Sequence, residues 1–114
     1  RVIAVFGCGG DRDKTKRPLM GAAAGQYADL TVLTSDNPRT EDPLAIIRDI
    51  LPGLSGPHLV IPDRREAIFR ALDLARPGDT VILCGKGHEI TQETGGHRLP
   101  MDERQIIAEY INGS

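Results

Sequence analysis

An acid, an amide and a guanidinium stand close together in the segment 34–43, which reads Thr-Ser-Asp-Asn-Pro-Arg-Thr-Glu-Asp-Pro. The segment follows the apolar run Leu30–Leu33, a pattern typical of a buried strand, and it precedes residues 43–51, whose apolar spacing predicts a helix. In an open α/β sheet, the loops that leave the carboxyl ends of the strands line the ligand-binding edge. The segment is therefore the first candidate for a binding site, with Asp36 and Arg39 as its charged groups.

Proline gives this loop a defined shape. Pro38 fixes its own φ and disfavours a helical conformation at Asn37. The planar guanidinium of Arg39 suits a carboxylate or a phosphate, whereas Asp36 and Asn37 can hold an ammonium group or brace the loop. The same residues also fit a plain Asx-Pro turn in front of a capped helix.

Two glycine-rich stretches stand at the ends of other predicted strands. Gly7–Gly10 follows residues 2–6, and Gly85–Glu89 follows residues 80–84. If these strands and the strand at 30–33 are parallel, the three loops open on the same edge of the sheet. The polar candidates there are Asp11, Arg12, Lys14, Asp36, Asn37, Arg39, Lys86, His88 and Glu89.

The first glycine loop fits neither of two common phosphate-binding motifs. A dinucleotide fingerprint aligned on Gly7 and Gly9 needs Gly or Ala where Arg12 stands, and no Gly-Lys-Ser or Gly-Lys-Thr completes a Walker A loop. A glycine-rich turn before a helix can still approach a phosphate, and a tight turn with a solvated charge run is the alternative.

Covalent or metal-assisted catalysis has little support in the sequence. His88 is a candidate proton-transfer group, but a lone histidine in a loop is more often a structural hydrogen-bonding partner. No nucleophile–base pair and no cluster of carboxylates stands out, so we assign no catalytic residue and no metal ligand.

Strands and helices alternate along the chain at the spacing of βαβ units. Predicted strands cover 2–6, 30–33, 58–61 and 80–84, and predicted helices cover 18–28, 43–51, 64–75 and 103–110. Residues 90–93 and 97–99 flank Thr-Gly-Gly and predict an antiparallel hairpin at the sheet edge. The predicted fold class is α/β, a Rossmann-like three-layer domain with a mostly parallel sheet and an antiparallel edge hairpin.

Local signals mark where the helices begin. Thr40 or Asp42 is the expected cap of the second helix, Asp63 of the third and Asp102 of the fourth. The small residues 21–25 are expected to let the first helix approach the sheet closely.

Size and charge restrict the class of protein. With 114 residues and a formal net charge of -2, the chain is expected to form one domain, residues 1–114, that does not bind nucleic acid. No apolar run has membrane-spanning length and no signal peptide is evident, so with only Cys8 and Cys84 present we expect a reduced, cytoplasmic protein without a membrane partner. Because the sequence starts directly in a strand without Met, we expect an excised C-terminal domain, with an N-terminally processed small protein as the alternative.

Three motifs in order, which span essentially the whole chain, resemble the C-terminal domain of the Mur ligase family. They are Gly9-Gly10-Asp11-Arg12-Asp13-Lys14 with Lys16-Arg17-Pro18-Leu19-Met20, then Asp36-Asn37-Pro38-Arg39, then Gly85-Lys86-Gly87-His88-Glu89. The Asp-Asn-Pro-Arg element is the most specific and is similar to the form found in the diaminopimelate-adding members.

The resemblance implies a function in peptidoglycan precursor synthesis. Such ligases use ATP and Mg²⁺ to join an amino acid to a UDP-MurNAc-peptide, and the N-terminal UDP-binding and central ATPase domains, which would hold most of these groups, are absent from this sequence. Carried over by position, the meso-diaminopimelate contacts would be Arg12, Asp36, Asn37, Pro38, Arg39, Gly85 and Glu89, and the nucleotide contacts Asp11 and Lys14. The isolated domain is expected to be inactive.

Other functions fit parts of the sequence. A lysine-adding or folylpolyglutamate ligase would share the fold, but the Asp-Asn-Pro-Arg loop argues against both. A standalone, non-catalytic module that binds an amino acid or a nucleotide is the alternative from a different class. A Rossmann-like oxidoreductase is disfavoured because Arg12 interrupts the glycine fingerprint.

Overall fold

A four-stranded parallel sheet forms the centre of the computed structural model, which describes residues 1–10, 14–84, 91–94, 97–100 and 102–112. The strands follow the order β3-β2-β1-β4, with β1 at Val2–Phe6, β2 at Leu30–Leu33, β3 at His58–Val60 and β4 at Thr80–Leu83. All three strand pairs are parallel, and Val5 lies opposite Val32 on one side and Leu83 on the other. The loops after β1 and β2 therefore leave the same edge of the sheet, as the sequence predicted.

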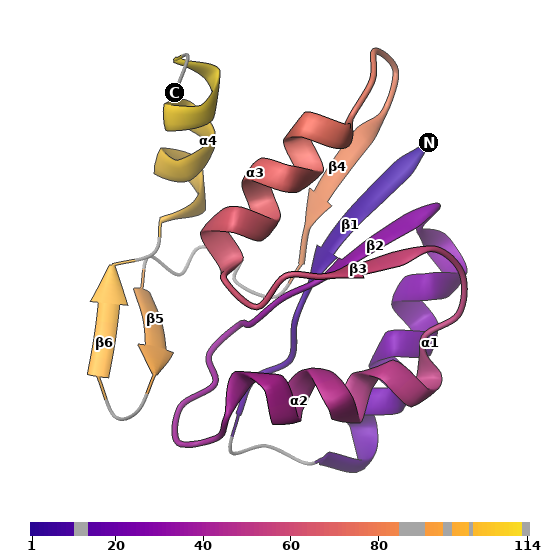
Figure 1. Cartoon of the computed structure of the whole chain (residues 1–114), viewed down its shortest axis with the longest axis vertical. Helices are drawn as coiled ribbons and strands as arrows, with labels where there is room; N and C mark the ends of the chain where they lie inside the picture. Colours follow the sequence, from indigo (N-terminus) through magenta and orange to yellow (C-terminus); the bar gives the residue numbers. More distant parts are fainter. Residues whose placement is uncertain (11–13, 85–90, 95–96, 101, 113–114) are drawn as a thin grey trace.

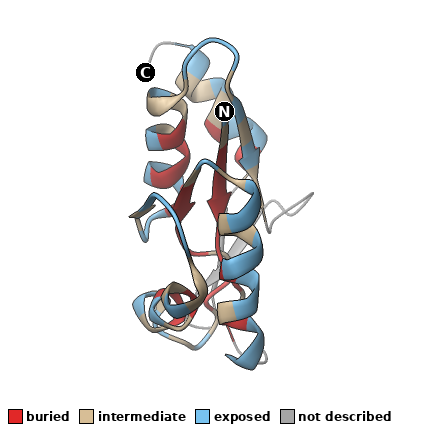
Figure 2. Ribbon diagram, turned by 90° about the vertical axis from the view of Figure 1, so that its right-hand side faces the viewer, coloured by how far each residue is buried: buried red, intermediate tan, exposed pale blue. Residues whose placement is uncertain are grey.

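Helices cover both faces of the sheet, which gives three layers (Figure 1). On one face, α2 (Pro43–Ile50) packs against Phe6 and Leu33, with α1 (Arg17–Tyr27) beside it. On the other face, α3 (Arg64–Leu74) packs against Ile3, Val5 and Val32, and α4 (Glu103–Ile111) lies against α3. Successive strand residues thus enter different cores, as expected for a strand covered on both faces. Figure 2 shows the buried residues concentrated in the strands and on the inner sides of the helices.

The predicted three-layer α/β architecture is confirmed, with one correction at the hairpin. Strands β5 (Thr91–Thr94) and β6 (His97–Pro100) are antiparallel, as expected. They form a separate two-stranded sheet instead of extending the edge of the central sheet (Figure 1). Turn chemistry fixes how the two strands pair with each other, but it does not determine whether the hairpin also pairs with β4.

Aspartate side chains cap three of the helices at the predicted positions. Asp42 accepts from the backbone N–H of Leu44, Asp63 from that of Glu66, and Asp102 from that of Arg104. Of the two candidate caps for the second helix, Asp42 is therefore the one used. Two 3₁₀ turns, Lys14–Lys16 and Leu51–Gly53, precede α1 and follow α2.

Gly21, one of the small residues of α1, makes a different contact from the predicted one. A Cβ atom added at Gly21 would lie 2.8 Å from the carbonyl oxygen of Ile50, at the end of α2. The close approach is thus made to the neighbouring helix, in the same layer, and not to the sheet.

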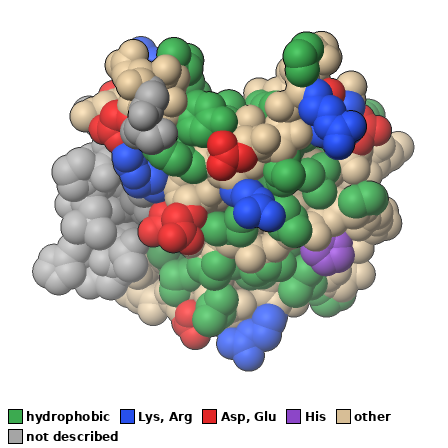
Figure 3. Space-filling model, turned by 45° about the horizontal axis from the view of Figure 1, so that its top comes forward, with side chains coloured by type: hydrophobic (Ala, Val, Ile, Leu, Met, Phe, Trp, Pro, Cys, Tyr) green, Lys and Arg blue, Asp and Glu red, His purple; other side chains and the backbone are tan. Residues whose placement is uncertain are grey.

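Charges of both signs are mixed on the molecular surface. On the face drawn in Figure 3, Lys and Arg side chains lie beside Asp and Glu side chains and between hydrophobic ones. Among the described helices, none is both long and apolar enough to cross a membrane.

Candidate functional site

The loop after β2 is buried and held by its backbone. Thr34 donates its N–H to the carbonyl of Phe6 at 2.9 Å, and Ser35 donates its hydroxyl to the carbonyl of Pro62 at 2.8 Å. Asn37 is buried, and Pro38 is among the fully buried side chains. A polar loop that is packed in this way keeps its side chains in defined positions, which a binding site requires.

The glycine turn after β1 lies directly against this loop. Gly10 donates its N–H to the carbonyl of Asn37 at 2.6 Å. A Cβ atom at Gly10 would lie only 1.8 Å from the carbonyl oxygen of Pro38, so a larger residue has no room there. Gly10 is therefore required because two backbones meet, and the predicted convergence of the first two loops is confirmed.

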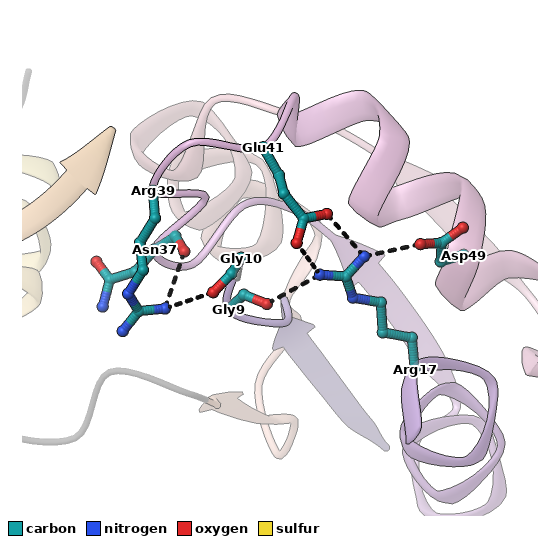
Figure 4. A network of polar contacts seen from close by, with 7 residues as sticks. All are labelled: Gly9, Gly10, Arg17, Asn37, Arg39, Glu41 and Asp49. Atoms are coloured by element: carbon teal, nitrogen blue, oxygen red, sulfur yellow. Dashed lines mark hydrogen bonds and ion pairs between the residues drawn. The ribbon is translucent and has the colours of Figure 1, made fainter. Parts of the chain in front are cut away.

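Arg39 adopts a strained backbone conformation at the meeting point. Its φ of 54° lies in the left-handed region, which costs a residue other than glycine about 1–2 kcal/mol. Its Nη1 donates to the carbonyls of Gly10 at 2.9 Å and Asn37 at 3.3 Å (Figure 4). Strain of this kind persists only where the surroundings enforce it, and it is concentrated at functional sites.

Arg17, a buried arginine at the start of α1, connects the loop after β1 with the loop after β2. The Arg17 guanidinium forms a two-pronged ion pair with Glu41, at 2.9 and 3.0 Å, and a third contact of 2.7 Å with Asp49 (Figure 4). Its Nη2 also donates to the carbonyl of Gly9 at 3.3 Å. The hydrogen bond with Glu41 is the largest of the effects that raise the pKa of Arg17 above its ordinary value, so this guanidinium stays charged.

A second buried arginine joins the ends of β2 and β4. Arg64 donates to the carbonyl of Ser35 at 3.0 Å, to the carbonyl of Cys84 at 2.9 Å and to the carboxylate of Glu103 at 2.9 Å. Its side chain is completely buried. Ser35 lies at the start of the second predicted loop and Cys84 directly precedes the third, so Arg64 holds the chain where both loops begin.

The structure brings four of the nine predicted site residues into one loop. These residues are Asp36, Asn37, Pro38 and Arg39, which follow β2 in sequence, and the last three lie against Gly10. Lys14 lies in the exposed 3₁₀ turn before α1. The other four, and two further candidates considered with them, lie outside the described residues: Asp11, Arg12, Gly85, Glu89, Lys86 and His88.

Sequence reasoning missed the roles of Arg17 and Arg64. Arginine is mostly exposed, and both residues stand among other charged residues in the sequence. A signal was nevertheless present in the helical spacing, because Arg64 precedes Ala67, Ile68 and Ala71 on the buried stripe of α3. An arginine on an apolar stripe indicates a guanidinium that has buried partners.

Burial near the site also changes the acidity of a thiol. Both cysteines are free, as expected. Burial, opposed by the charge of Arg17 and aided by that of Asp36, raises the pKa of Cys8 to about 11. Burial likewise raises the pKa of Cys84, again opposed by an arginine, Arg64.

The raised pKa of Cys8 predicts a loss of stability at alkaline pH. Between about pH 9 and pH 11 the unfolded thiol loses its proton while the folded thiol keeps it, so unfolding becomes easier as the pH rises. The slope from this one group approaches about 1.4 kcal/mol per pH unit. Urea unfolding of the chain at pH 8 to 11 should show this decline, and the Cys8→Ala variant should show a shallower one. Equal slopes for both proteins would contradict the assignment.

Among the residues that the structure describes, no three His, Cys, Asp or Glu side chains gather in a way that could hold a metal ion. The described loop after β2 carries a guanidinium at Arg39, an amide at Asn37 and a carboxylate at Asp36.

A parallel three-layer domain with a ligand loop at the carboxyl edge is a class of fold shared by many enzymes. Residues 1–87 match the family described as "Mur ligase, glutamate ligase domain". The match covers most of the chain, so the chain belongs to the Mur ligase family.

Individual relatives show which members of the family the chain resembles. The chain is 53% identical over 99% of its length to the UDP-N-acetylmuramoyl-L-alanyl-D-glutamate–2,6-diaminopimelate ligase of Syntrophomonas wolfei, and 55% identical over 97% of its length to the ligase of that name from Caldanaerobacter subterraneus. A solved structure with the same enzyme name superposes with a TM-score of 0.94 at 47% identity and covers 98% of the chain. The chain spans about a quarter (24%) of the length of each of these three proteins.

Proposed function

We propose that the chain is the C-terminal, amino-acid-binding domain of an ATP-dependent ligase. This ligase adds meso-diaminopimelate to UDP-MurNAc-L-Ala-D-Glu in the cytoplasm, as a step of peptidoglycan precursor synthesis. The names of the similar ligases support the reaction. The observation that carries the proposal is the contact of the Asp36–Arg39 loop with Gly10, which brings the Arg39 guanidinium to the turn that follows β1 at the carboxyl edge of the sheet.

The chemistry of diaminopimelate fits these groups. The molecule has an amino-acid centre at each end, and one of its amines must stay free to attack. The carboxylate at the other end would pair with Arg39, and the ammonium group beside it would pair with a carboxylate such as Glu89. Lysine lacks that second carboxylate and could not form this ion pair with Arg39, so it would lose the binding free energy that the pair supplies.

The whole set of site residues remains part of the proposal. We assign diaminopimelate binding to Arg12, Asp36, Asn37, Pro38, Arg39, Gly85 and Glu89, and nucleotide contacts to Asp11 and Lys14. Asp36 and Asn37 hold the shape of the loop that carries Arg39. The glycine before residues 86–89 would let the ligand approach the backbone.

The domain contributes to the reaction by positioning and by excluding water. In such a ligase, ATP would transfer its γ-phosphate to the glutamate carboxylate and leave as ADP, and the incoming amine would then lose a proton and displace phosphate from the acyl phosphate to form the amide bond. Holding the amine in place provides much of the acceleration, and closing the cleft protects the acyl phosphate from hydrolysis. From the resemblance to the Mur ligases, we assign Mg²⁺ and most of the ATP contacts to the rest of the ligase.

Amino-acid selectivity tests this function. The full-length ligase that carries this chain should use meso-diaminopimelate in preference to L-lysine by a factor on the order of 10⁴ in kcat/KM, because lysine cannot form the proposed ion pair with Arg39. The 114-residue chain alone should show no turnover. Equal use of the two amino acids would contradict the proposed specificity, and turnover by the chain alone would contradict its role as one part of a larger ligase.

Amide NMR spectra of the labelled chain provide a second measurement. Titration with meso-diaminopimelate should shift the resonances of Asn37 and Arg39 more than titration with L-lysine does. Lack of turnover by the full-length protein with either amino acid, combined with nucleotide-induced shifts in the chain, would favour a non-catalytic binding module.

A further inference from the structure

The proposed site depends on a backbone conformation that needs support. Arg39 has a φ of 54°, and on one side of it the loop is held by Gly10, which bonds to Asn37 and to the Arg39 guanidinium. Two residues beyond Arg39, the loop reaches Glu41, whose N–H donates to the carbonyl of Pro38 at 2.9 Å and closes the turn. Arg39 therefore lies within a short turn that is held in place on both sides.

An ion pair between Glu41 and Arg17 holds the turn on the side away from Gly10. Both carboxylate oxygens of Glu41 accept from Arg17, a geometry that fixes orientation as well as distance. The Arg17 side chain is 2% exposed and that of Glu41 is 16% exposed, so water screens this pair poorly. Because Arg17 also donates to the carbonyl of Gly9, it connects Glu41 to the same glycine turn that contacts Arg39 (Figure 4).

We propose that Arg17 and Glu41 are positioning residues that hold Arg39 in its binding conformation. Neither residue needs to touch the amino acid. Their effect is to hold the turn 38–41 against the glycine turn, so that the guanidinium of Arg39 is placed before the ligand arrives. This inference rests on the proposed function, because it assigns a supporting role to residues behind that site.

The chain offers a matched control for this idea. Asp49 is the third acidic contact of Arg17, but it lies on α2 and its side chain is 41% exposed. Glu41→Gln and Asp49→Asn each remove one of the negatively charged partners of the Arg17 guanidinium. Only the first substitution weakens the connection to the Arg39 loop.

Steady-state kinetics of the full-length ligase that carries this chain should distinguish the role of Glu41 from that of Asp49. Glu41→Gln should raise the KM for meso-diaminopimelate about tenfold, within the range by which residues without ligand contact change binding, and should change the KM for ATP less than twofold or so. Asp49→Asn should change both KM values by less than about twofold. Arg17→Lys, which keeps the charge but loses the two-pronged geometry, should resemble Glu41→Gln.

The outcomes distinguish this inference from the proposed function. Equal effects of Glu41→Gln and Asp49→Asn, or equal effects of Glu41→Gln on diaminopimelate and on ATP, would overturn the positioning role. If Arg39→Ala impairs diaminopimelate use while Glu41→Gln does not, the proposed function stands and only this inference fails. If neither variant affects diaminopimelate selectively, the proposed site itself is wrong.

A spectroscopic measurement tests the same step without turnover. In amide NMR spectra of the chain, Glu41→Gln should shift the resonances of Gly10, Asn37 and Arg39, because their contacts depend on the turn. Asp49→Asn should leave these three resonances close to their original positions. Unchanged spectra in the Glu41→Gln variant would also overturn the inference.

Discussion

Replacement of Arg39 by Ala is expected to reduce kcat/KM for meso-diaminopimelate on the order of 10³-fold in the full-length ligase. Removal of one partner from a buried charge pair costs about 2–5 kcal/mol in binding, and a loss of about 4 kcal/mol corresponds to this factor. The KM for ATP should change less than threefold or so, because the nucleotide contacts are assigned to Asp11 and Lys14 and not to Arg39. The selectivity for diaminopimelate over lysine should fall by a similar factor, since the lost group is the one that distinguishes the two.

Three further variants define what Arg39 contributes. Arg39→Lys keeps the charge but not the planar fork, so it should recover part of the lost activity. Arg39→Gly should lose as much diaminopimelate use as Arg39→Ala, yet fold more stably by about 1 kcal/mol, because glycine accepts a φ of 54° without strain. Arg48→Ala removes an exposed arginine from α2 and should leave both substrates unaffected. Equal losses for diaminopimelate and ATP in Arg39→Ala would exclude a carboxylate-binding role.

Local sequence signals determined most of the fold. Continuous apolar runs such as residues 2–6 predict strands that are buried on both faces, and the helix caps at Asp42, Asp63 and Asp102 depend on residues within one turn. The hairpin was predicted as an antiparallel pair for the same reason. Its separation from the central sheet was not predicted, because the local sequence signal indicates only that the two strands pair with each other.

The candidate site was predictable in position but not in detail. Parallel topology places the loops after β1 and β2 on one edge, and the contact between Gly10 and Asn37 agrees with that argument. The left-handed backbone of Arg39 could not be predicted from the sequence, because tertiary contacts impose the turn and no glycine marks it. The burial of Arg17 and Arg64 was not predicted, because both stand among charged residues in the sequence and their partners come from distant segments.

Substitution of Arg64 by Met is expected to destabilise the chain by about 3–5 kcal/mol, the usual cost of breaking a buried ion pair from one side. The variant removes three donors at once and leaves Glu103 buried without its cation. The carbonyls of Ser35 and Cys84 also lose their Arg64 donor. Urea unfolding of the chain, with fluorescence or circular dichroism as the signal, measures the difference as a change in midpoint.

The neighbouring arginine on the same helix provides the control. Arg65 pairs with Glu109 and lies 4.9 Å from the ring centre of Phe69, but its side chain is 47% exposed, so Arg65→Met should cost less than about 1 kcal/mol. The double variant Arg64→Met with Glu103→Leu should be more stable than Arg64→Met alone, because it removes the unpaired carboxylate. A residual loss of about 1–3 kcal/mol should remain, since the carbonyls of Ser35 and Cys84 still miss the hydrogen bonds from Arg64. If Arg64→Met and Arg65→Met cost the same, the Arg64 guanidinium does not hold β2 and β4 together, and the spacing of the loops that follow them must be set elsewhere.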